Sequence, residues 1–230
     1  MSVDGAACGA ARAGIRARLD GLLRDLDPAA LDAVCPTTPE WTGRDVLAHL
    51  VGVDADILAG NLAGAGTDAW TAVQVAQRRG RSTVELLDEW AEIGPQVEGI
   101  AGAFGDAAGQ WCFDAATHEH DLRLLVGAPG EQNSDAVALG TAWMLMRMGE
   151  RFDAEGLAAL TFAFADDGGT ITVGTRLPAT EVTVDRFDVF RAACGRRSRE
   201  QIDAWGWTDA PRSSDLVRPP FSPAPITVVE

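Results

Sequence analysis

The sequence predicts a helical bundle followed by a small α+β domain. Up to about residue 152, apolar residues recur every three or four positions, a period typical of amphipathic helices. After that point the period changes to two, and two alternating segments, 160–165 and 170–175, flank a hairpin turn at 166–169. We therefore expect a bundle over residues 1–153 and an α+β domain over residues 154–230.

Residues typical of helix beginnings and ends indicate where the helices of the bundle lie in the sequence. We expect helices at 6–26, 44–62, 82–104, 111–127 and 136–151, with a shorter one at 69–81. Thr42 and Ser82 are each followed three residues later by an acidic residue, which is the pattern of a capping box. Ser134 is a third N-cap, and Gly127 ends the helix that begins at Trp111.

The carboxy-terminal part reads as short strands and short helices. A third strand is expected at 180–184, after the two strands of the hairpin. Asp185 and Ser198 are the expected N-caps of two helices, and Gly195 ends the first of them. The proline-rich segment 211–225 should lie extended over the surface.

The net charge and the spacing of the cysteines indicate which kinds of partner and site the protein is expected to have. Asp and Glu number 34 against 19 Lys and Arg, and a net charge of −15 disfavours binding to nucleic acid or to an anionic membrane. The four cysteines show no paired spacing, which excludes a thiolate zinc motif and is typical of reduced thiols. Neither a signal peptide nor a membrane-spanning stretch is recognisable, so we expect a cytoplasmic protein with a small-molecule partner.

Two of the three histidines lie in the segment 111–127. On a helical projection His118 falls within the apolar stripe, with Asp114 one turn before it and Asp121 three residues after it. His49 projects from the inward edge of the helix at 44–62. Because a catalytic zinc-type site uses three protein ligands, we interpret His49, His118 and Asp114 as a metal site, with Asp121 orienting an imidazole.

The same pattern has a simpler alternative, in which His49 and His118 are core histidines hydrogen-bonded to Asp45 and Asp121. Both alternatives stay open at the level of the pattern. Glu119 and His120 point away from the stripe, and we expect them to be exposed.

Two stretches of the predicted bundle, residues 41–52 (WTGRDVLAHLVG) and 111–123 (WCFDAATHEHDLR), resemble a known family. This is the mycothiol-dependent maleylpyruvate isomerase family of the DinB-like superfamily. Residues 187–202 (FDVFRAACGRRSREQI), with Trp205, resemble that family's second domain, which is similar to sterol-carrier folds. The resemblance spans nearly the whole chain and implies a DinB-like four-helix bundle followed by a small α+β domain.

The resemblance also implies a divalent ion, usually zinc. Its ligands are a histidine on the second helix and an acidic residue and a histidine one turn apart on a later helix, and these fall on His49, Asp114 and His118. The family's usual acidic ligand is glutamate, so Asp114 is one methylene shorter. Glu119 or His120 is the alternative third ligand.

The implied cofactor besides the metal is mycothiol, a small-molecule thiol that a metal ion keeps as the nucleophilic thiolate. Addition of the thiolate to a small electrophile and its departure gives cis–trans isomerisation, and displacement of a leaving group gives S-transfer, with no protein nucleophile needed. Arg196 or Arg197 would bind a carboxylate of the thiol or substrate. The alternatives are that these arginines are surface charges at a helix end, and that the protein is a non-catalytic binder of a metal or small ligand.

Overall fold

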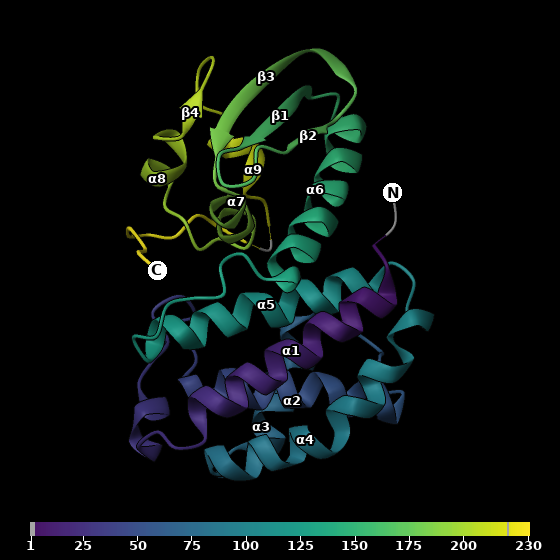
Figure 1. The fold of residues 1–230 in the computed structure, drawn as a ribbon, viewed down its shortest axis with the longest axis vertical. Helices are drawn as coiled ribbons and strands as arrows, with labels where there is room; N and C mark the ends of the chain where they lie inside the picture. The colour runs from purple at the N-terminus through teal and green to yellow at the C-terminus, as the bar shows by residue number, and fades with distance from the viewer. Residues whose placement is uncertain (1–2, 220) are drawn as a thin grey trace. The chain divides into compact units, whose positions relative to one another are not determined.

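The computed structural model describes residues 3–219 and 221–230 (Figure 1). The described residues divide into two compact units, Val3–Glu131 and Gln132–Glu230. The first unit is helical, and the second carries a four-stranded sheet with helices. A helix-rich amino-terminal region followed by a small mixed-sheet unit confirms the predicted fold class.

Five α-helices build the first unit, and two of the connections between them contain a short 3-10 segment. They are α1 (Gly5–Leu23), α2 (Gly43–Ala59), α3 (Asp68–Arg78), α4 (Thr83–Ile100) and α5 (Ala107–Leu125), with η1 (Pro28–Asp32) and η2 (Ala101–Ala103). Helix α1 packs against α4 and α5, and α2 packs against α3, α4 and α5. Figure 1 shows these helices running side by side in one bundle.

The predicted capping boxes form at the helix starts. Thr42 accepts from the backbone N–H of Asp45, and the Asp45 carboxylate accepts from the backbone N–H of Thr42, which fixes the start of α2. Ser82 and Glu85 make the same reciprocal pair at α4. These local hydrogen bonds fix the residue at which α2, the helix that carries His49, begins.

The second unit begins with α6 (Asp135–Glu155), followed by β1 (Ala158–Phe164), β2 (Thr170–Val173), β3 (Arg176–Val184), α7 (Arg186–Ala193), α8 (Arg199–Asp203), β4 (Gly206–Trp207) and α9 (Ser213–Leu216). The strand order is β2-β1-β3-β4, in which β1 pairs antiparallel with β2 and parallel with β3. The predicted hairpin is therefore present, with Phe162 opposite Ile171.

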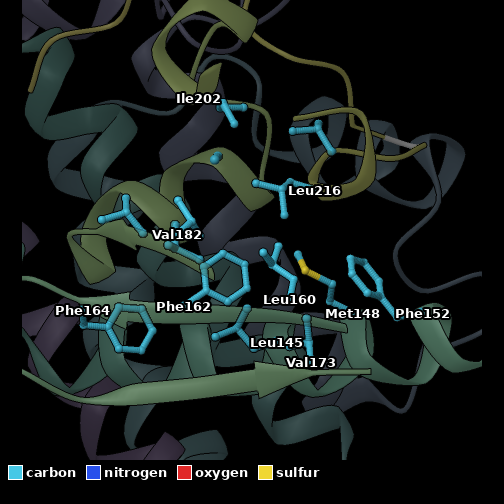
Figure 2. Close-up of a cluster of buried hydrophobic side chains, with 14 residues drawn as sticks. Leu145, Met148, Phe152, Leu160, Phe162, Phe164, Val173, Val182, Ile202 and Leu216 are labelled. Carbon is cyan, nitrogen blue, oxygen red and sulfur yellow. The ribbon is translucent and has the colours of Figure 1, made fainter. Parts of the chain in front are cut away.

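A single apolar core lies between the sheet and the helices of this unit (Figure 2). Side chains of β1 such as Phe162 meet Leu145, Met148 and Phe152 of α6, a helix that the sequence analysis counted with the bundle. The predicted boundary at residues 153/154 stays a prediction, because a compact unit and an independently folding domain need not share their limits.

Two local predictions in this unit need correction. Asp185 occupies the N-cap position of α7 but makes no side-chain capping bond. The proline-rich segment is not extended throughout, because it contains α9 and buries Ser213, Leu216 and Val217. Apolar side chains spaced between the prolines gain more from burial than an extended surface path allows.

Within the described ranges, none of the helices combines the length and the apolar character that crossing a bilayer requires.

Candidate metal centre

The structure brings His49, Asp114 and His118 together inside the first unit. His49 comes from α2, and Asp114 and His118 lie one turn apart on α5. One potential ligand atom from each residue lies within 4.8 Å of the other two. The Asp114 Oδ1 atom is 3.3 Å from His49 Nε2 and 3.7 Å from His118 Nε2. Among the described residues, this is the one such group of histidine, cysteine and carboxylate side chains.

The contact with Asp121 determines that Nδ1 of His118 carries a proton. The Nδ1 atom of His118 lies 3.0 Å from Asp121 Oδ2, and the other oxygen of Asp121 accepts from the Thr37 hydroxyl at 2.8 Å. An ionised carboxylate only accepts hydrogen bonds, so Nδ1 of the imidazole is the donor. The remaining nitrogen, Nε2, then carries its lone pair toward Asp114.

The proton of His49 is fixed in the same way by an amide. Its Nδ1 lies 2.9 Å from Gln74 Oε1, and Gln74 Nε2 donates to Asp56 Oδ2 at 2.8 Å. Since the Asp56 carboxylate must accept, the amide turns its carbonyl to His49, whose Nδ1 therefore donates. The Nε2 lone pair of His49 also points at Asp114.

The three side chains therefore converge, with Nε2 of each imidazole facing the Asp114 carboxylate. Asp114 Oδ2 is in addition buried and has no hydrogen-bond partner among the residues that the structure describes. Burial raises the pKa of Asp114, but the electrostatic interaction and hydrogen bond with His49, followed by the interactions with His118 and Arg12, outweigh burial and hold that pKa well below the usual range. A carboxylate buried against two imidazoles favours a positive charge at this point, carried either by a proton on an imidazole or by a metal ion.

The spacing fits a small divalent ion. Zinc–nitrogen bonds of about 2.0–2.1 Å at a tetrahedral angle separate two ligand atoms by about 3.3 Å. The Asp114–His49 distance of 3.3 Å meets this value, and the Asp114–His118 distance of 3.7 Å is slightly longer. Two imidazoles and one carboxylate leave a tetrahedral ion one open position, as catalytic zinc sites do.

Trp41 forms an aromatic wall beside the two imidazoles. Its ring centroid lies 5.2 Å from that of His49 and 5.9 Å from that of His118, whose own rings are 5.1 Å apart in an edge-on arrangement. The indole restricts both rings and covers them with apolar surface. Electrostatic interactions at the site are strengthened where water is excluded.

The other predicted candidates lie elsewhere. Glu119 and His120 are buried, so the prediction that they are exposed is wrong. Glu119 accepts two hydrogen bonds from Arg18, at 2.8 and 2.7 Å, and it does not belong to the group of three. Asp45, the alternative partner of His49, caps α2 instead. Asp114 is therefore the carboxylate that the structure places beside the two histidines.

Sequence reasoning missed Gln74, the actual partner of His49. A signal was present, since Gln74 stands beside Val75 on the inward side of the predicted short helix at 69–81. A polar residue on an inward face needs a hydrogen-bond partner, and that requirement points to a buried network.

Arg196 and Arg197 lie in the second unit, directly after α7. Arg196 Nη1 donates to the Cys194 carbonyl at 2.6 Å. Arg197 Nε donates to Asp188 Oδ1 at 2.7 Å, and its Nη1 donates to Glu230 Oε2 at 2.8 Å. The predicted role of these arginines in binding a thiol or substrate stays a prediction.

Comparison with known proteins places this geometry in a family. The model of the mycothiol maleylpyruvate isomerase N-terminal domain matches residues 12–128, just over half of the chain. The chain belongs to this family. The matched range contains all three residues of the candidate metal centre. The resemblance of the second unit to sterol-carrier folds stays a prediction.

Solved structures give the same result for the fold. The chain is similar to the crystal structure of the mycothiol-dependent maleylpyruvate isomerase, with a TM-score of 0.57 at 11% identity over 89% of this chain and 95% of that one. A histidine-to-alanine mutant of that enzyme gives a TM-score of 0.55 at the same identity and coverage. Identity this low shows the shared fold alone. No curated protein sequence matches the chain.

Proposed function

We propose that this protein is a divalent-metal- and mycothiol-dependent enzyme, of isomerase or thiol S-transferase type, that acts on a small electrophilic substrate. The observation that carries the proposal is the convergence of two imidazoles and one carboxylate, whose potential ligand atoms lie within 4.8 Å of one another. Family membership supports mycothiol as the thiol.

His49, Asp114 and His118 would hold the ion, and the mixed nitrogen and oxygen set suits zinc. An ion bound there supplies an open position that stabilises a thiol as its thiolate at neutral pH. The protein's own contribution is orientation: Gln74 and Asp121 keep both imidazoles with Nε2 inward. Trp41 shields that side of the site from water.

A thiolate bound there would supply a nucleophile. It could add reversibly to a carbon–carbon double bond conjugated to a carbonyl group, which permits cis–trans isomerisation, or displace a leaving group that departs with its electron pair. His49, Asp114 and His118 would hold the ion that binds this thiolate.

Two further parts of the proposal concern recognition and location. Arg196 or Arg197 would bind a carboxylate of the thiol or of the substrate through charge-assisted hydrogen bonds. We place the enzyme in the cytoplasm, which is supported by four free cysteines.

Elemental analysis tests the metal site. We expect one equivalent of a divalent metal, predicted to be zinc, in the wild-type protein and a loss of it in His49→Ala and in His118→Ala. His120→Ala is the matched control, because His120 shares α5 with His118 but is not one of the three grouped residues. Metal that persists in both site variants contradicts the proposed ligands.

Turnover tests the reaction. The metal-loaded protein with mycothiol should isomerise cis-alkenes conjugated to a carbonyl group or consume the thiol with alkyl halides, and His118→Ala should do neither. A protein that binds the metal stoichiometrically yet turns over none of these electrophiles supports the non-catalytic alternative.

A further inference from the structure

The two histidines of the metal centre are held by chemically different partners. His118 donates to the charged carboxylate of Asp121, whereas His49 donates to the neutral amide of Gln74. Gln74 lies on α3, which contributes none of the three grouped residues, and its side chain is fully buried. A buried glutamine of this kind is retained only with its hydrogen bonds satisfied.

A chain of hydrogen bonds fixes the orientation of this amide. Gln74 Nε2 donates to Asp56 Oδ2 at 2.8 Å, and Asp56 Oδ1 accepts from Asn61 Nδ2 at 2.9 Å. Asp56 lies two turns after His49 on α2, so one helix supplies the ligand and the anchor of its partner. The amide cannot flip without placing its carbonyl against the Asp56 carboxylate.

Gly52 makes this arrangement possible. A Cβ atom at position 52 would lie 2.5 Å from Gln74 Cβ and 2.9 Å from Gln74 Cγ, distances that real side chains do not tolerate. His49, Gly52 and Asp56 follow at spacings of three and four residues, so they share one face of α2. The missing side chain lets α3 approach closely enough for Gln74 to reach His49.

We propose that Gln74 is a positioning residue of the metal centre, held by Asp56 and admitted by Gly52. It selects the His49 tautomer with the proton on Nδ1, and so it keeps the Nε2 lone pair aimed at Asp114 and the ion. This inference rests on the proposed function in one respect, because it assumes that the three grouped residues bind a metal. The hydrogen bond between Gln74 and His49 is itself independent of the metal.

Gln74→Ala and Gln77→Ala are a matched pair, because Gln77 is exposed one turn later on α3. Competition with a chromophoric chelator gives the zinc dissociation constant of each. Loss of a partner behind a metal-bound histidine typically weakens binding about 10- to 100-fold, and we expect this for Gln74→Ala. Gln77→Ala should match the wild type, and so should the secondary structure of both variants by circular dichroism.

Nitrogen-15 NMR of the imidazoles in the metal-free protein gives a second readout. Wild-type His49 should show a protonated Nδ1 and an unprotonated Nε2 at a pH where the ring is neutral. In Gln74→Ala the two tautomers should mix, whereas His118 keeps its form through Asp121. A merely structural role of Gln74 would leave the His49 tautomer unchanged.

A charge swap separates positioning from packing. Gln74→Glu alone sets a carboxylate against Asp56 and should weaken metal binding. Combined with Asp56→Asn, it restores the bond between positions 56 and 74 with donor and acceptor exchanged. The new amide donates to the carboxylate at position 74 and still accepts from Asn61, and that carboxylate accepts from His49. We expect the double variant to recover the wild-type dissociation constant to within about threefold, a residual well below the loss from removing such a partner.

The outcomes distinguish the inference from the function on which it rests. A wild-type protein that binds no metal overturns the proposed function, and the NMR comparison still tests the role of Gln74. A wild-type protein that binds metal, with Gln74→Ala equal to Gln77→Ala in affinity and in the tautomer of His49, overturns the inference. Failure of the charge swap to recover affinity overturns the role assigned to Asp56.

Discussion

Asp54→Ala should strongly destabilise the first unit, because Asp54 is the centre of a fully buried polar cluster. Arg12 Nη2 donates to Asp54 Oδ1 at 2.8 Å, and neither side chain is exposed to solvent. The indole N–H groups of Trp111 and Trp90 donate to the same carboxylate at 2.9 and 2.7 Å. The cluster joins residues of α1, α2, α4 and α5.

The expected loss of stability follows from the groups that lose their partner when Asp54 is replaced by alanine. Removing one member of a buried ion pair costs about 3–5 kcal/mol, and each buried N–H that loses its acceptor costs about 1–3 kcal/mol. These terms overlap because water and neighbouring groups rearrange, so we expect a loss of about 4 kcal/mol in the free energy of unfolding. For a chain of this size, that lowers the unfolding temperature by roughly 10 °C.

Scanning calorimetry of the full chain measures this change. Asp88→Ala is the matched control, because Asp88 pairs with Arg24 at 2.9 Å but is 63% exposed, and surface pairs contribute little. We expect the control to unfold at the wild-type temperature. Equal unfolding temperatures for Asp54→Ala and Asp88→Ala would refute the reasoning.

Four further outcomes are expected. Burial raises the pKa of Asp185, and two neighbouring aspartates raise it further. The ionised group therefore disfavours folding once the pH exceeds this pKa. Asp185→Asn should raise the unfolding temperature at pH 7 and leave it unchanged at about pH 3. Glu230→Ala removes the carboxylate that two buried arginines bind and should cost about 3 kcal/mol by urea titration, whereas Val229→Ala, at an exposed position, should have no effect. Thr37→Val leaves Asp121 less firmly oriented and should weaken metal binding by less than Gln74→Ala, measured by the same chelator competition. Chelation of the metal should leave the far-ultraviolet circular dichroism of the wild type unchanged while lowering its unfolding temperature.

The sequence contains enough information to find the three grouped residues. Asp114 and His118 are one turn apart on a single helix, so helical geometry alone places their side chains on one face. The capping box that begins at Thr42 can be recognised in the sequence, and it marks where α2, the helix that carries His49, begins. Asp121 is found for the same reason, because its contact with His118 is local.

Contacts between helices are what the sequence does not reveal. Gln74 reaches His49 only because α3 crosses α2 at Gly52, and no periodicity within either helix predicts that crossing. The error over Glu119 and His120 has a related cause. A helical projection assumes one buried face, whereas α5 is buried on nearly all sides from Ala115 to Leu122. A charged residue there is explained by a partner such as Arg18, which comes from another helix.

The buried cluster around Asp54 helps to position the two helices that carry the candidate ligands. Besides binding Asp54, Arg12 donates to the backbone carbonyls of Leu50 and Trp111. Leu50 follows His49 directly on α2, and Trp111 precedes Asp114 by three residues on α5. The two helices are thereby fixed next to the ligands by hydrogen bonds that involve no metal. Because these hydrogen bonds order the ligands in advance, little of the free energy of metal binding is lost to ordering them. Three ligands can then bind the ion tightly enough to leave its fourth position open.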